Sequence, residues 1–149
     1  MKKVTFARFL AAALMALIVQ SCGAASGKSF ERVPPEGSQG MVYVYRVENT
    51  CLDTTAPDVL FDGRKIGALK NGGYLWKGAP SGPHVVLVSG VEDLDDIKLT
   101  LFVQEGEEHY VRWNPICEER WGATEFKIQI DVIDESKAAR EITSTRLSQ

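Results

Sequence analysis

The sequence predicts an all-β fold: an antiparallel β-sandwich or small barrel of about seven or eight strands, with a short C-terminal helix. From Met41 onward, apolar and polar residues alternate with period two in most of the chain, as in half-buried strands. Short clusters rich in glycine and proline separate these alternating segments at close intervals. Helical character is confined to the residues after 133.

In the first half of the domain, the alternating segments are 41–47, 56–61, 65–69 and 74–77. Asp62-Gly63 separates the second segment from the third and is typical of a two-residue hairpin turn. Asn71-Gly72-Gly73 precedes the fourth segment and is a second turn of the same kind. Four short strands joined by tight connections are therefore expected here.

In the second half, the alternating segments are 84–89, 97–104, 108–114 and 126–132. Pro80-Ser81-Gly82-Pro83 separates the first of them from the preceding strand. Residues 134–142 have the composition of a short helix, and Asp134 is expected to be its N-cap.

The N-terminus has the three parts of a bacterial lipoprotein signal peptide. Lys2, Lys3 and Arg8 form a basic region, and residues 9–19 are an unbroken apolar run, too short to span a bilayer. The run ends in Val19-Gln20-Ser21-Cys22-Gly23, which resembles a lipobox. Residues 1–21 are therefore predicted to be removed.

Cleavage before Cys22 would leave this cysteine to carry the lipid, including palmitate, as the membrane anchor. We expect the protein in the cell envelope, and in the outer membrane facing the periplasm, because glycine rather than aspartate follows the cysteine. Residues 22–40, rich in small residues and proline, are expected to be a flexible tether. Residues 41–149 are expected to form a single β-sandwich domain.

The charge of the chain disfavours nucleic acid as a partner. The formal net charge is −3, and removal of Lys2, Lys3 and Arg8 leaves 14 of 17 basic side chains against 20 acidic ones, a charge of −6. Nucleic-acid binding needs clustered lysine and arginine. An acidic surface also adheres poorly to anionic lipid, so we expect membrane contact through the lipid itself.

The three cysteines fit an extracytoplasmic protein. Lipidation of Cys22 would leave Cys51 and Cys117 as an even pair, and a disulfide is the default in an oxidising compartment. It would link the loop after the first strand to the loop before the last long strand. The alternative is two buried, unpaired thiols in a cytoplasmic protein.

Sequence motifs for catalysis are missing, and we expect no enzyme and no cofactor. His84 and His109 lie on separate predicted strands, outside any spacing typical of zinc ligands, and each is expected to be a partly exposed strand residue. No nucleophile or phosphate-loop motif occurs in the sequence.

We also expect no metal site. The acidic run 92–96 contains oxygen ligands of the kind that calcium prefers, but it lacks the glycine and terminal glutamate of an EF-hand loop. A solvated loop is the favoured interpretation, with calcium binding as the alternative. Glu105, Glu107 and Glu108 surround a turn and are interpreted in the same way.

Four aromatic residues are weak candidates for ligand binding: Tyr74, Trp76, Trp113 and Trp121. The first two alternate on one strand and share a face, while the two later tryptophans flank the segment around Cys117. Exposed, they would stack on a sugar or hold a peptide; in a sandwich such residues are more often core. Arg46 and Arg112 are expected to form buried charge pairs with Asp or Glu.

Three segments resemble those of a known family: Val42-Tyr43-Val44-Tyr45-Arg46, the hairpin from Phe61 to Tyr74, and Pro80-Ser81-Gly82-Pro83-His84. Together they are similar to a family of small bacterial envelope lipoproteins that is classed as a domain of unknown function. The resemblance covers Met41 to Ser89 best. It implies a lipid-anchored or secreted β-sandwich without an assigned activity, so it supplies no catalytic residues.

These observations leave three classes of function. The first is a non-enzymatic accessory lipoprotein that binds an envelope protein or peptidoglycan. The second is an inhibitor of a periplasmic or host hydrolase such as lysozyme, whose basic surface an acidic protein would complement. An enzyme comes third because only two histidines are present.

Overall fold

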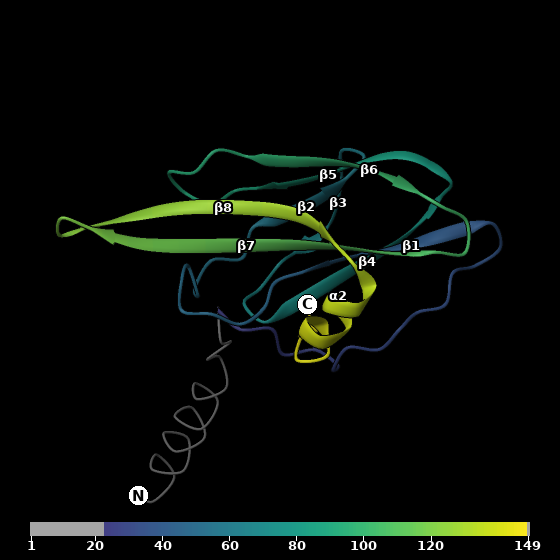
Figure 1. The fold of residues 1–149 in the computed structure, drawn as a ribbon, viewed down its shortest axis with the longest axis horizontal. Coiled ribbons are helices and arrows are strands. Elements are labelled where there is room, and N and C mark those ends of the chain that lie inside the picture. Colours follow the sequence, from purple (N-terminus) through teal and green to yellow (C-terminus); the bar gives the residue numbers. More distant parts are fainter. Residues whose placement is uncertain (1–22, 149) are drawn as a thin grey trace, which may run out of the picture.

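The predicted fold class is confirmed. The computed structural model describes residues 23–148, in which two β-sheets of five and four strands face each other and one short helix follows (Figure 1). The predicted signal peptide, residues 1–21, and the lipidation site, Cys22, lie outside the described residues.

The elements agree with the alternation in order and place. They are β1 Gln39–Tyr45, β2 Asp58–Phe61, β3 Arg64–Ala68, β4 Gly73–Pro80, β5 Gly82–Ser89, β6 Ile97–Val103, β7 Glu108–Arg120, β8 Ala123–Ile133, α2 Glu135–Ile142 and β9 Arg146–Leu147. Asp134 is the N-cap of α2, as predicted, because its carboxylate accepts a hydrogen bond from the Lys137 N–H. Asp62 and Gly63 both have positive φ, which is the backbone of the predicted two-residue turn.

The sandwich is not purely antiparallel, which corrects the sequence prediction. The sheets have the orders β8-β7-β1-β4-β9 and β3-β2-β5-β6, and the pairs β1–β7 and β4–β9 are parallel. The chain leaves the first sheet after β4, forms β5 and β6 in the second sheet, and returns as β7 on the far side of β1. A crossover of this kind is what parallel neighbours require.

The main core lies between the two sheets. Strand β1 sends Val42 and Val44 into it, β7 adds Val111 and Trp113, and the second sheet contributes from β2, β5 and β6. Every one of these four side chains is at most 1% exposed. The apolar residues of the alternating pattern thus face inward from both sheets, as the sequence predicts.

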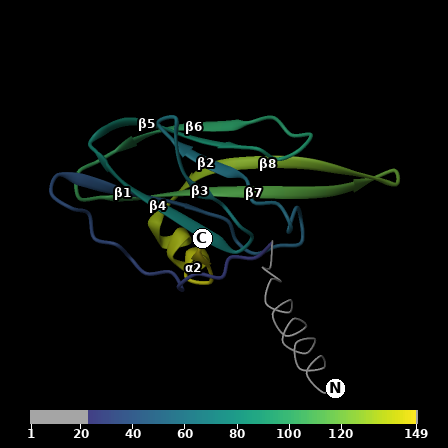
Figure 2. The same ribbon diagram turned by 180° about the vertical axis from the view of Figure 1, so that it is seen from behind.

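A second apolar layer covers the outer face of the five-stranded sheet. The tyrosines of β1 and β7, Tyr43, Tyr45 and Tyr110, pack there with Ala138 and Ile142 of α2. Seen from behind, α2 lies against this sheet, on the side away from β5 and β6 (Figure 2). Strand β1 is therefore buried on both faces and is the centre of the molecule.

The N-terminal segment follows the body of the domain instead of extending as a free tether. The Gly27 N–H donates to the Leu147 carbonyl, and the Phe30 N–H donates to the Thr145 carbonyl. The Phe30 ring packs edge-on against Tyr43 at 5.3 Å between centroids. Composition predicts flexibility here because most of these residues are small or polar; one aromatic side chain and pairing beside β9 dock the segment.

Strands β7 and β8 form one hairpin that is longer than predicted. The ladder continues to the pair Arg120↔Ala123, and the hairpin extends beyond the ends of the other strands (Figure 1). Residues 118–127 are mostly exposed and charged, so no inward-facing apolar residues mark the strands there. Backbone pairing holds this part of the hairpin, together with cross-strand contacts such as Lys127–Glu118 at 2.8 Å and Thr124–Glu119 at 2.9 Å.

Candidate functional site

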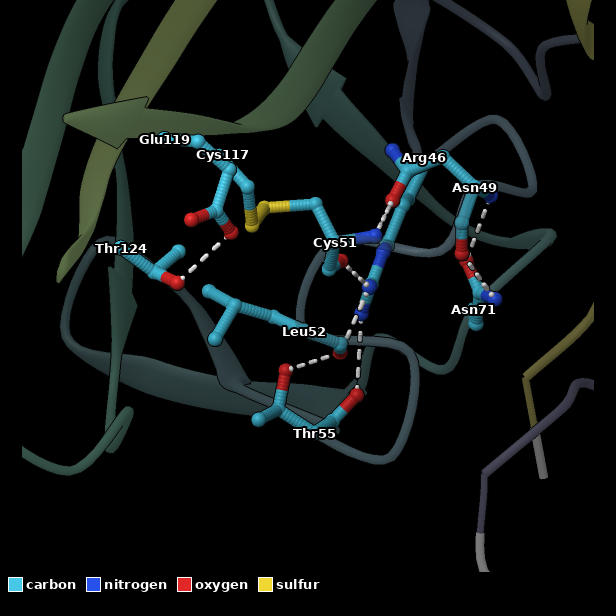
Figure 3. The surroundings of a disulfide bond; sticks show 9 residues. All are labelled: Arg46, Asn49, Cys51, Leu52, Thr55, Asn71, Cys117, Glu119 and Thr124. Atoms are coloured by element: carbon cyan, nitrogen blue, oxygen red, sulfur yellow. Dashed lines mark hydrogen bonds between the residues drawn. A yellow bond between two sulfur atoms is a disulfide. The ribbon is translucent and has the colours of Figure 1, made fainter. Parts of the chain in front are cut away.

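The predicted disulfide is present between Cys51 and Cys117. Cys51 lies in the loop after β1, as expected, whereas Cys117 lies within β7 rather than in a loop (Figure 3). This correction has the same cause as the length of the hairpin, because the residues around Cys117 lack apolar alternation. The bond fastens the projecting hairpin to the loop that connects the two sheets.

Arg46 is held by carbonyl groups instead of the carboxylate that the sequence predicts. Its side chain is fully buried, and its guanidinium donates to the carbonyls of Cys51, Leu52 and Thr55 at 2.7–2.9 Å (Figure 3). Its Cζ lies 4.9 Å from the centre of the Trp113 ring. Burial lowers the pKa of Arg46 to about 10, so the side chain is still charged at neutral pH. It acts as an internal template for the loop that carries Cys51.

Arg112 makes the predicted charge pairs. Its guanidinium lies 3.0 Å from the Glu141 carboxylate of α2 and 3.9 Å from Asp131 of β8. The Tyr45 hydroxyl donates to the same Glu141 at 2.6 Å. Burial and this carboxylate raise the pKa of Tyr45 above its usual range. Tyr45, Arg112 and Glu141 therefore join α2 to the five-stranded sheet, which is a structural role.

The four aromatic candidates divide into two buried and two exposed residues. Tyr74 and Trp113 are 3% and 1% exposed and belong to the two apolar layers. Trp76 shares the face of Tyr74, as predicted, but it is 42% exposed at the edge of that layer. Trp121 is fully exposed. Only Trp76 and Trp121 remain available to a ligand.

Trp121 is at the tip of the β7–β8 hairpin. It has φ +50° and is followed by Gly122 with φ +83°, so both central residues of the turn are left-handed. Glu118, Glu119 and Glu125 lie on the strands beside the tip. The result is a projecting finger with an indole at its end and carboxylates along its sides.

Sequence reasoning missed a contact between Asp62 and His84. The Asp62 carboxylate, at the β2–β3 turn, accepts from His84 Nδ1 at 2.7 Å and from the Val85 N–H at 2.9 Å. The other ring nitrogen faces the Pro80 carbonyl at 2.9 Å, and Phe61 stacks on the ring. The sequence signal for this contact was the family resemblance, because Asp62 and His84 each belong to one of the three segments that carry it.

Residues 36–123 match the family described as protein of unknown function (DUF2846). The chain belongs to the DUF2846 family. The matched residues include β1 to β7 and end at the tip of the β7–β8 hairpin. The chain matches no curated protein.

Residues from the three segments that resemble the family make contacts that hold the DUF2846 domain together. Arg46 positions the loop of Cys51, and Asp62 binds His84. The first contact holds the loop that follows β1, and the second joins the β2–β3 turn to β5. These residues therefore explain how the DUF2846 fold is held, and they leave the exposed features open to a binding role.

The pKa values of the two histidines of the DUF2846 domain are shifted in opposite directions. Burial alone would lower the pKa of His84, but hydrogen bonds to Asp62 and Pro80 outweigh it and raise the pKa above the usual value. The same contact with His84 lowers the pKa of Asp62. Burial lowers the pKa of His109, whose Nε2 accepts a hydrogen bond from the Gln104 N–H.

We expect His84→Gln to destabilise the protein more at about pH 6 than at about pH 8.5, by up to about 1 kcal/mol for a pair partly open to water. A raised folded pKa gives stability that is complete below the unfolded pKa of about 6.5 and is lost as the pH rises through the folded pKa. Urea unfolding of parent and variant at both pH values measures the difference, and His109 cancels because both proteins contain it. His109→Gln is the control and should show the reverse trend. Equal losses at both pH values would contradict the assignment.

The acidic run 92–96 of the DUF2846 domain is an exposed connection between β5 and β6. Within residues 23–148, no three His, Cys, Asp or Glu side chains gather in a way that could hold a metal ion. In the same part of the chain, none of the helices has the length and apolar character needed to cross a bilayer.

Proposed function

We propose that this protein is a lipid-anchored, non-enzymatic binding module of the bacterial cell envelope, and that the tip of its β7–β8 hairpin contacts another envelope protein or peptidoglycan. The observation that carries the proposal is the fully exposed Trp121 at the end of the projecting hairpin.

The requirements of the fold do not account for a tryptophan at this position. A left-handed residue in a two-residue turn is normally Asn, Asp or Gly, and other residues cost about 1–2 kcal/mol there. A fully exposed indole returns none of this cost through burial in the core. Tryptophan is, however, enriched among residues that dominate binding energy. Backbone strain combined with an exposed indole supports a recognition role.

The state of the histidines supports a role without catalysis. Both ring nitrogens of His84 are engaged, by Asp62 and by the Pro80 carbonyl. Nε2 of His109 accepts a hydrogen bond from a backbone N–H. A histidine needs a free ring nitrogen within reach of a nucleophile to act as its base. His84 has no free ring nitrogen, and the lone pair of neutral His109 already accepts from the Gln104 N–H, so neither has a free lone pair to act as a base.

The anchor rests on Cys22 and the signal sequence before it. We expect Cys22→Ser to move the protein from the membrane fraction to the soluble fraction, or to leave an unprocessed precursor of higher mass. Fractionation and mass spectrometry measure both effects. Ser21→Ala, which keeps a small residue before the cysteine, is the control and should stay membrane-bound. A Cys22→Ser protein with unchanged fractionation and mass would contradict lipid anchoring.

Trp121→Asn separates recognition from folding. Asparagine suits a left-handed turn position, so we expect the free energy of unfolding to stay equal or to rise by up to about 1 kcal/mol. Loss of the indole should reduce partner binding at least tenfold, as expected for a hot-spot residue. The readouts are retention on peptidoglycan and cross-linking in cell envelopes from a photoreactive residue at position 124, beside the tip.

A photoreactive residue at Lys98, on the outer face of β6, is the matched control for non-specific cross-linking. Capture at position 124 that requires Trp121 supports the proposal. Equal capture from both positions, or capture unaffected by Trp121→Asn, would contradict it.

Inhibition of a hydrolase is a second candidate, favoured by the shape and charge of the same hairpin. A finger that ends in Trp121 suits insertion into the cleft of a basic enzyme such as lysozyme. Glu119 adds a carboxylate without an ion pair among the described residues, whereas Glu118 and Glu125 lie beside Lys127 and Arg120. An assay of cell-wall lysis with parent and Trp121→Asn proteins tests it. Inhibition by the parent alone favours this role, and full lysis in both cases contradicts it.

A further inference from the structure

A pocket of about 500 Å³ opens at one end of the sandwich, beside the Asp62–His84 contact and apart from the β7–β8 hairpin tip. It lies where the β2–β3 hairpin approaches the second half of β4, and its walls include Phe61, Ile66, Arg64 and Lys77. Small-molecule sites have volumes of about 300–1,000 Å³ and combine apolar walls with a few polar groups. This pocket has both properties.

Basic side chains occupy strand positions that otherwise face the core. On β4, Lys77 lies between Leu75 and Ala79, which are both buried between the sheets. On β3, Arg64 is opposite Phe61, another buried core residue. Side chains two residues apart on a strand share a face, so both cations stand on the inner faces of their sheets. At this end of the sandwich, charged side chains therefore occupy inner-face positions where strand alternation predicts apolar residues.

His84 extends the arrangement to a third strand. It precedes Val86 on the inner face of β5 and lines the same pocket. Its ring is clamped by Asp62 and backed by Phe61. Three strands from both sheets thus direct basic groups toward one opening.

Two of the basic side chains in the pocket retain an uncompensated charge. The other two are paired with carboxylates at 2.7 Å, namely His84 with Asp62 and Lys65 with Asp58. Arg64 and Lys77 have no ion-pair partner within residues 23–148. The lining also includes the Asp62 carboxylate, which His84 neutralises only when protonated, so Arg64 and Lys77 supply the unpaired positive charge that would attract a dianion here.

We propose that this pocket binds a phosphate monoester that carries an apolar or aromatic group. A phosphate monoester has a charge of about −1.5 to −2 at pH 7, which matches the two free cations. The guanidinium of Arg64 can donate two parallel hydrogen bonds to phosphate oxygens, and Lys77 supplies a point charge. Phe61 and Ile66 provide a wall for the organic group. The site is independent of the hairpin tip and of the partner proposed for it.

Two sources would provide this chemistry: a soluble phosphate monoester, or the head group of a phosphatidic-acid lipid in the membrane. Calorimetric titration of the full chain with phenyl phosphate and with dihexanoyl phosphatidic acid distinguishes them by relative affinity. Phenol and inorganic phosphate are the partial probes. We expect either whole probe to bind more tightly than either partial one.

Arg64→Gln and Lys77→Gln should each weaken the tighter probe about tenfold, and they should melt at the parent temperature because both side chains are exposed. Lys98→Gln, on the outer face of β6, is the matched control and should bind as the parent does. The proposal is overturned if neither whole probe binds, if phenol binds as tightly as phenyl phosphate, or if the two pocket variants bind like the control.

Discussion

Arg46→Met should lower the free energy of unfolding by about 3–5 kcal/mol. Methionine replaces the aliphatic stem but not the guanidinium, so the carbonyls of Cys51 and Thr55 lose the donor that now binds them, and the Leu52 carbonyl keeps only its bonds from Thr55. Removing one side of a buried charged network has a cost of this size. Urea unfolding at pH 7 measures the loss.

Arg140→Met is the matched control, because Arg140 is exposed on α2 and methionine has similar helix propensity. It should change stability by no more than about 0.5 kcal/mol. A comparable effect in both variants would show that Arg46 is not a template for the loop.

Replacement of Cys51 and Cys117 by alanine should cost about 4 kcal/mol. The bond closes a loop with a sequence separation of 66 residues, and chain entropy assigns about this value to such a loop. Residues 51–117 include β2 to β6, and therefore the whole four-stranded sheet. Without the disulfide, the residues that form this sheet gain conformational entropy in the unfolded chain, which lowers the free energy of unfolding.

Unfolding of the parent protein in the presence of a reducing agent provides the control, and it should reproduce the loss seen in the double variant. The same agent should have no effect on the double variant. A loss below about 1 kcal/mol in both experiments would contradict a stabilising role. Because the Cys51 carbonyl accepts from Arg46, the two losses should not be additive.

Strand positions were predictable where one face of a strand is buried. Residues 97–104 alternate clearly, and the structure has a strand there because the apolar side chains must face the core. The turn Asp62-Gly63 was predictable for a different reason, since only certain residues accept positive φ. Both signals are local in the sequence.

What escaped prediction depends on the three-dimensional path of the chain. Phe30 docks on Tyr43, and nothing in residues 23–40 shows that an aromatic surface will be present. Arg46 was expected to bind a carboxylate, but the nearest acceptors are carbonyls of its own loop. The parallel pairing of β1 with β7 follows from the path of the chain, which periodicity does not encode.

The candidate site was only partly visible for the same reason. Tyr74, Trp76, Trp113 and Trp121 are alike as residue types, and burial alone separates the two core residues from the two exposed ones. The sequence does contain one indication of the pocket, because Lys77 interrupts the inward-facing series of Leu75 and Ala79 on β4. A charged residue within a core series marks an opening in the sandwich.

The docked N-terminal segment has a consequence for how far the protein can reach. Fully extended, residues 23–40 would span about 60 Å, enough for the domain to search a wide shell above the membrane. In the structure the Asn71 N–H donates to the Gly23 carbonyl, so the segment is docked on the domain from its first described residue and provides no extended linker. A lipid on Cys22 would then hold the domain close to the bilayer surface. Its partners would be those that come to the membrane or lie beside it.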